Sequence, residues 1–322
     1  MNKHWYIELQ AIHRIDGKET RSMSTNMKTL YTEIKKLPYF DLRIGVMFYF
    51  YDNPIECKKE IKEVFRMYCN ITKLPFVFYR YDMDENLKMK MIKGGYVQFF
   101  NRFIDRNNFN LSKYIILTDA TAEKLQNVKC EMMLSNYESS YALRLPNRMY
   151  FEFLPPVCYD DLLNFIRSSC KIMKIHYCCC NPLLGVNDYC LTKSSSYAIN
   201  QIKKQICLSD KYSVFDNPTL LKDLETKIDG ANAIQVFSST LYSLIGQENL
   251  ICQCRNYNLY CEVENDYMIT AVSKEKIPEY DEEFLTSYIA LNNVMKDIIS
   301  YMKKPLMFWK ENEWNVWKER LV

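Results

Sequence analysis

The chain has 322 residues, of which 48% are hydrophobic and 25% charged, a composition that excludes an intrinsically disordered protein. No run of 18 or more apolar residues occurs, and the opening MNKHWYIELQAIHRIDG lacks the apolar core of a secretory signal, so we expect a cytoplasmic protein without a membrane-spanning helix. Residues 1–150 hold 24 Lys and Arg against 17 Asp and Glu, and residues 151–322 hold 18 against 22, which leaves open a mixed solvated surface or an acidic face that meets a basic partner.

The first half of the chain contains a strong strand signal followed by a helix signal. The run RIGVMFYFY, residues 43–51, is rich in β-branched and aromatic residues and predicts a buried strand. Asn53 can cap a helix and Pro54 suits the first helical position, so a helix is expected to follow and to end near Cys69. Its core face is predicted from residues at helical spacing: Ile61, Val64, Phe65 and Tyr68.

A similar strand–proline–helix unit returns later in the chain. Residues 150–154 predict a strand that ends at Pro155-Pro156, and residues 158–171 predict a helix. Pro54 and Pro156 lie 102 positions apart, which leaves open a duplication or the independent recurrence of a common unit. The apolar face of this helix is predicted to comprise Tyr159, Leu162, Leu163, Ile166 and Cys170, where Leu163 and Ile166 match Ile61 and Val64 at the same offset.

Shorter elements complete the predicted fold. The predicted strands are residues 5–12, 75–81, 114–118, 128–134, 141–145, 250–254, 258–263 and 267–272. The predicted helices are residues 27–36, 197–207 and 281–302, with a loop at 216–218 and an apolar segment at 231–245 that ends at Gly246. Because strands and helices do not alternate strictly, the fold class is α+β, with mixed or antiparallel sheets, packed helices and two related strand–helix modules. The expected domains are an N-terminal module, 1–147, and a C-terminal module, 148–322, with one compact unit as the alternative.

The stretch KIHYCCCNPLLGVNDYC, residues 174–190, holds four cysteines and one of the three histidines. Structural zinc sites use CxxC or paired histidines, whereas residues 178–180 are contiguous cysteines that would alternate between the two faces of a strand. A catalytic cysteine requires a positioned base, and the sequence places no histidine opposite one. We therefore expect these thiols to pack as small apolar side chains, with no metal and no cofactor.

Other candidate motifs also have structural explanations. Asp160-Asp161 and Asp281-Glu282-Glu283 stand at expected helix starts, where acidic side chains complement the helix dipole. Gly94-Gly95 follows Lys93 but lacks the surrounding sequence of a phosphate-binding loop, so it predicts a turn. No catalytic residue is assigned on these grounds.

Basic and aromatic residues interleave between residues 79 and 106. Such a mixture is typical of single-strand nucleic-acid binding. Asp82, Asp84, Glu85 and Asp105 are interspersed and dilute the positive charge, so nucleic-acid binding stays an alternative. The set comprises Arg80, Lys88, Lys90, Lys93, Arg102 and Arg106, with Tyr79, Tyr81, Tyr96, Phe99, Phe100 and Phe103.

Several segments, in this order, resemble a known family. They are LRIGVMFYFYDNPIECKKEIKEVFRMYC, LRLPNRMYFEFLPPVCYDDLLNFIRSSC followed by KIHYCCCNPLLGVND, then IDGANAIQVFSSTLYSLIG, YMITAVSKEKIPEYDEEFLTSYIALNNVMKDI and the terminal WNVWKERLV with Trp317 and Arg320. Together they span roughly residues 42–322 and resemble the type VI immunity family, encoded beside toxins of the bacterial type VI secretion system. Ile234 or Gln235 stands where the family usually has Trp, and Val272 or Ser273 where it usually has Gly.

The resemblance implies a cytosolic immunity protein that neutralises a cognate effector toxin by stoichiometric binding and is not an enzyme. It implies no cofactor, no nucleic acid and no membrane as partners, and leaves a homodimer open. The alternatives are a hydrolase or transferase that uses a Cys or a carboxylate, and a single-stranded nucleic-acid-binding protein. Because the second half is acidic, we expect the toxin to bind at Glu262, Glu264, Asp266, Glu279, Tyr280, Asp281, Glu282 and Glu283.

Overall fold

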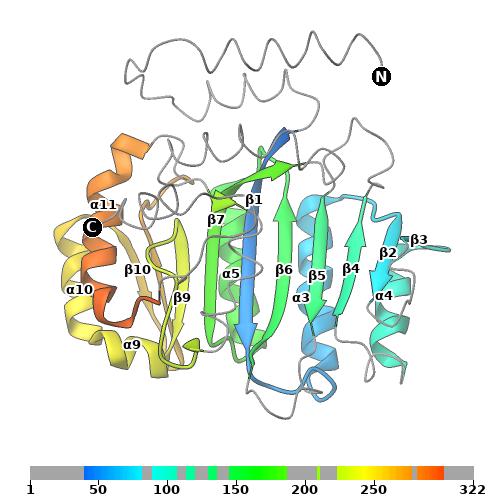
Figure 1. Cartoon of the computed structure of the whole chain (residues 1–322), viewed down its shortest axis with the longest axis horizontal. Coiled ribbons are helices and arrows are strands. Elements are labelled where there is room, and N and C mark those ends of the chain that lie inside the picture. Colours follow the sequence, from blue (N-terminus) through cyan, green and yellow to red (C-terminus); the bar gives the residue numbers. More distant parts are fainter. Residues whose placement is uncertain are drawn as a thin grey trace, which may run out of the picture.

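One sheet of eleven strands forms the centre of the molecule (Figure 1). The computed structural model describes residues 40–81, 89–106, 114–119, 130–135, 145–186, 209–210, 223–277 and 281–300. The strands are β1 (Phe40–Phe50), β2 (Phe78–Tyr81), β3 (Lys90–Met91), β4 (Tyr114–Thr118), β5 (Glu131–Ser135), β6 (Asn147–Phe153), β7 (Tyr177–Val186), β8 (Ser209–Asp210), β9 (Ile234–Ser238), β10 (Tyr260–Val263) and β11 (Tyr267–Ala271).

The strands lie in the order β10-β11-β9-β7-β1-β6-β5-β4-β2-β3, and β8 pairs with β7 in parallel. The other described strand pairs are antiparallel. With its packed helices this sheet makes the fold α+β, as predicted. Strands from both sides of residue 147 share the sheet, since β1 lies between β6 and β7. The division into two modules at that residue stays a prediction.

Helices cover the two faces of the sheet. The helices are α3 (Lys58–Thr72), α4 (Tyr96–Asp105), α5 (Tyr159–Ile172), α9 (Ser239–Ile245), α10 (Gln247–Asn256) and α11 (Asp281–Met295), with a 3-10 helix, η3 (Lys296–Ile298). One face packs on α3, α4 and α5 and is called here the α5 face. The other packs on α9, α10 and α11 and is called the α11 face. In the described part of the chain no helix is long and apolar enough to cross a bilayer.

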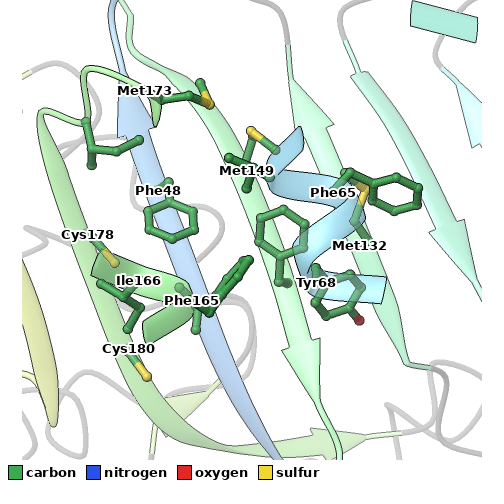
Figure 2. Close-up of a cluster of buried hydrophobic side chains, with 14 of the residues drawn as sticks. Phe48, Phe65, Tyr68, Met132, Met149, Phe165, Ile166, Met173, Cys178 and Cys180 are labelled. Atoms are coloured by element: carbon green, nitrogen blue, oxygen red, sulfur yellow. The ribbon is translucent and has the colours of Figure 1, made fainter. Parts of the chain in front are cut away.

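Strict alternation along the central strands divides their side chains between the two faces. In β1, Val46 and Phe48 point to the α5 face, whereas Met47 and Tyr49 point to the α11 face. The other central strands, β6 and β7, alternate in the same way, and Figure 2 shows Phe48, Phe165, Tyr68, Cys178 and Cys180 gathered on the α5 face. These strands are buried on both sides, which explains their nearly continuous apolar sequence.

The two predicted strand–helix units lie side by side. β1 pairs with β6 antiparallel, and α3 contacts α5 on the α5 face. The predicted core faces of both helices are buried, including Ile61 and Val64 in α3 and Leu163 and Ile166 in α5. Duplication of the unit stays a hypothesis.

The predicted start of α3 is corrected by the structure. The side-chain oxygen of Asn53 accepts a hydrogen bond from the Ile55 amide (2.8 Å), and its carbonyl accepts one from the Glu56 amide (2.9 Å). These bonds close a turn rather than begin the helix. Cys57 then has φ −98° and ψ 30°, outside the α-helical values, so the helix begins only at Lys58.

Three other predicted elements differ in the structure. The expected strand at 250–254 is wrong, because Leu250 and Cys254 are buried at helical spacing within α10. The apolar segment 231–245 divides into β9 and α9, and the hydroxyl of Ser238 caps α9 by accepting from the Leu241 amide (3.4 Å). The last helix ends at Met295 instead of 302, and Ile299 forms a bridge with Ile228.

Several predictions lie outside the described residues. They are the strand at 5–12, the strand at 141–145 except for Leu145, the helices at 27–36 and 197–207, the loop at 216–218 and the terminal segment with Trp317 and Arg320.

Candidate functional site

The three contiguous cysteines lie in the middle of the sheet. β7 pairs with β1 on one side and β9 on the other, and Cys178, Cys179 and Cys180 are at most 2% exposed. Cys178 and Cys180 point to the α5 face and Cys179 to the α11 face, as the alternation predicted. Burial raises the pKa of all three thiols well above the ordinary value, so they remain neutral side chains that fill space.

His176, just before these cysteines, is held by structural contacts. Its Nε2 lies 2.8 Å from the carbonyl oxygen of Leu224, and its Nδ1 lies 3.1 Å from the hydroxyl of Ser238. The ring of Tyr51 packs edge-on against the imidazole, with 5.0 Å between centroids. Both ring nitrogens are therefore engaged in joining β7 to neighbouring segments. Within the described ranges, no group of three His, Cys, Asp or Glu residues is placed to hold a metal ion.

Three residues of the predicted acidic interface, Glu262, Glu264 and Asp266, lie at one end of the sheet, on the β10–β11 hairpin. Glu262 accepts hydrogen bonds from Arg167 Nε (2.9 Å to each carboxylate oxygen) and Arg167 Nη2 (2.8 Å), and Tyr260 also donates to it. Burial by itself raises the pKa of Glu262. The hydrogen bonds and the Arg167 charge lower the pKa by more than burial raises it, so the net shift is downward. Glu262 is thus paired within the chain.

The remaining acidic residues are only partly described. Glu264 and Asp266 are exposed in the turn between β10 and β11. Residues 281–283 form the start of α11, and their side chains are outside the described part, as are residues 279 and 280. The structure therefore brings Glu262, Glu264 and Asp266 together on one hairpin. That this surface binds a toxin stays a prediction.

A pocket of about 460 Å³ lies near the opposite end of the sheet, between β2, β3 and α4. We call it the basic pocket. Tyr79 and Tyr81 lie two apart on β2 and so share one side of the strand. Phe99, Arg102 and Phe103 lie on one stripe of α4, Arg106 follows the end of that helix, and Met91 and Lys93 come from β3 and the segment after it. It is lined by Tyr79, Tyr81, Met91, Lys93, Phe99, Arg102, Phe103 and Arg106.

Aromatic contacts fix the pocket walls. Tyr79 and Tyr81 are parallel within 6°, with ring centroids 6.1 Å apart. Tyr79 packs against Phe99 (4.4 Å) and Tyr81 against Phe103 (5.8 Å), which joins the strand to the helix. These distances lie in the range of stabilising aromatic pairs.

The cations of the basic pocket have no acidic partner among the residues that the structure describes. In the part of the chain that the structure describes, neither Lys93, Arg102 nor Arg106 forms an ion pair. Asp105 precedes Arg106 in the sequence, but its carboxylate pairs with Lys62 of α3. The sequence pattern of interleaved rings and cations had indicated this region but missed Met91, because an exposed methionine carries no pattern of its own.

A buried polar network lies on the α11 face and was not predicted. Tyr177 donates to the carboxylate of Asp229, and the Asn232 amide donates to Tyr177 (2.8 Å) and to Asp229 (3.1 Å). Asn181 donates to Asn232 and accepts from the Ala233 amide (2.9 Å). The network anchors the segment before β9 to β7. Its sequence signal is the polar IDGANAIQ motif, residues 228–235, in which Gly230 has a φ of 112° that favours glycine.

The comparisons with known proteins concern the whole fold. No family model matches the sequence, and no curated protein matches it. Among solved structures, the fold is similar to that of the Pseudomonas aeruginosa T6SS protein PA0821, with a TM-score of 0.67 and 10% sequence identity. The match covers 91% of this chain and 90% of that chain. At this level of identity the likeness shows a shared fold.

Proposed function

We propose that this chain is an immunity protein that neutralises a cognate type VI secretion effector toxin by stoichiometric binding. The observation that carries the proposal is the fold shared over about nine-tenths of both chains with a T6SS protein. The sequence segments that resemble the type VI immunity family form the β1–α3 and β6–α5 units and the network around Asn232. The resemblance and the shared fold support the same biological context. Fold alone does not fix function, so the assignment requires a direct test.

The arrangement of reactive groups supports a binding role over the enzyme alternative. The thiols of β7 are buried and neutral, and His176 is engaged by Leu224 and Ser238. Asp160 and Asp161 lie in the first turn of α5, where they complement the helix dipole. These groups serve packing and helix stability.

The test is co-expression with the neighbouring gene. We expect the neighbouring product to arrest growth when expressed alone and this chain to restore growth in the same cells. The purified proteins should elute from a sizing column as one complex at micromolar concentration. If both are soluble and elute separately, and growth is not restored, the proposal is wrong.

A further inference from the structure

We propose that the basic pocket is the surface by which this chain holds its protein partner, and that the partner fills it with an apolar side chain flanked by carboxylates. The inference rests on the proposed function, which requires a protein partner. It places the contact at the opposite end of the sheet from the acidic hairpin predicted from sequence.

The composition of the pocket matches the core of a protein–protein interface. Such cores are enriched in Tyr, Phe, Met and Arg, and pockets lined by these residues receive the anchoring side chains that dominate affinity. Met91, at the pocket rim, is 64% exposed on the edge strand β3. A large apolar side chain at this exposure on an edge strand is available for burial by a partner.

The charge of the pocket indicates the chemistry of that partner. Lys93, Arg102 and Arg106 line it without an ion pair among the described residues, and none of the described lining residues is acidic. At the other end of the sheet, Glu262 is already paired with Arg167. Three cations around the aromatic side chains attract carboxylates, which would steer the partner and fix its register.

The pocket is held rigid by its neighbours. β2 is hydrogen-bonded between β3 and β4, and α4 packs on α3 through Phe100 and Phe65, whose ring centroids are 4.1 Å apart. The Lys62–Asp105 ion pair joins the same two helices. A preformed pocket binds with a smaller loss of conformational entropy than a flexible one.

The ring contacts favour a protein segment over single-stranded nucleic acid. Base stacking requires open ring faces. Here Tyr79 packs on Phe99, while Tyr81 contacts Phe103 and has the Lys90 ammonium 5.4 Å from its ring centroid. Because these rings are engaged, an inserted side chain fits the pocket better than a stacked base.

The experiment measures affinity for the purified product of the gene beside the one that encodes this chain, by titration calorimetry at physiological salt. The test variants are Arg102→Glu/Arg106→Glu and, separately, Met91→Asp. The matched controls are Arg255→Glu/Lys296→Glu, exposed cations outside the pocket, and Val263→Asp, which is 41% exposed on the other edge strand. Thermal unfolding of every variant verifies the fold.

We expect the double charge reversal, Arg102→Glu/Arg106→Glu, to weaken binding by at least about a hundredfold and Met91→Asp to weaken it by about tenfold or more. The control variants should stay within about threefold of the wild type, and Arg102→Lys/Arg106→Lys should stay within about tenfold because it keeps both charges. If the wild type binds and the pocket variants bind equally well, the pocket inference is wrong while the proposed function stands. If the wild type does not bind the neighbouring product, the proposed function and the pocket inference are both wrong. If instead a labelled oligo(dT) strand binds and loses affinity in the double reversal, the pocket is a nucleic-acid site and the inference is overturned.

Discussion

The two faces of the central sheet both bury apolar side chains, but the α11 face also contains a buried polar network that the α5 face lacks among the described residues. On the α5 face, Phe48, Phe151 and Phe165 meet in edge-to-face contacts with centroids 5.3 to 6.1 Å apart. On the α11 face, Tyr49 stacks on Tyr177, whose hydroxyl enters the network with Asp229. This face also buries charged side chains of β1 and β6: Arg43, Arg148 and Glu152.

The difference between the two faces shows what apolar and polar burial each contribute to the fold. Apolar aromatic packing on the α5 face contributes most through buried area, which depends little on direction. Buried polar groups on the α11 face stabilise only if each finds its partner, so they fix the position of particular segments. Both faces therefore contribute stability through buried apolar side chains, and the α11 face in addition fixes where the segment before β9 lies.

Thiol labelling tests whether both faces are equally closed to water. We expect the exposed Cys158 and Cys252 to react with a maleimide at least about a thousandfold faster than Cys178, Cys179 and Cys180, because buried, neutral thiols react only after opening. Peptide mass spectrometry of timed samples measures the rates, and labelling in guanidinium provides the unfolded reference. Faster labelling of Cys179 than of Cys178 would show that the α11 face admits water.

Phe151→Ala tests the aromatic packing of the α5 face. Phe151 is fully buried and contacts Phe48, Tyr68 and Phe165. Its truncation is expected to lower the free energy of unfolding by about 3–5 kcal/mol. Denaturant titration followed by circular dichroism measures the change. Tyr257→Ala, at an exposed aromatic, should change it by less than about 0.5 kcal/mol. Similar losses in the two variants would contradict the packing argument.

Asn232→Ala tests the network of the α11 face. It leaves Tyr177, Asp229 and Asn181 with fewer partners and should lower the free energy of unfolding by about 1–3 kcal/mol. A double-mutant cycle that combines Asn232→Ala with Tyr177→Phe should show a coupling free energy of at least about 0.5 kcal/mol, because both residues form hydrogen bonds with Asp229. Asn256→Ala, at an exposed helix end, serves as the control. Purely additive losses would mean that the network does not act as a unit.

Glu262→Gln tests the charged rim of the α5 face, where Arg167 pairs with Glu262. At neutral pH the variant should lose about 1 kcal/mol. Since the pKa of Glu262 is lowered in the folded state, this contribution is complete above the unfolded value of about 4.3 and is lost as the pH falls through the folded value. The stability difference between the wild type and the variant should therefore shrink progressively as the pH falls below about 4.3 in acid titrations. The exposed pair Glu63–Arg66 is the control, and Glu63→Gln should have no measurable effect. A difference that stays constant as the pH falls below about 4 towards acid unfolding would contradict the assignment.

The sequence by itself determined the elements whose pattern is local. Alternation predicted that neighbouring cysteines of β7 point to opposite faces, and helical spacing predicted the buried stripes of α3 and α5. The short run at 250–254 was misassigned as a strand, because a run of that length does not distinguish a strand from a buried turn of helix.

Only the tertiary structure decided which distant residues meet. Arg167 pairs with Glu262, 95 positions away, and Asn232 bonds Tyr177, 55 positions away. The basic pocket likewise forms because β2 and α4 pack together. Local periodicity depends on residues that are close in the sequence. Strand order and helix placement depend on the burial of many side chains at once. A charged residue without a nearby partner in the sequence, such as Glu262, can therefore be paired in the folded protein.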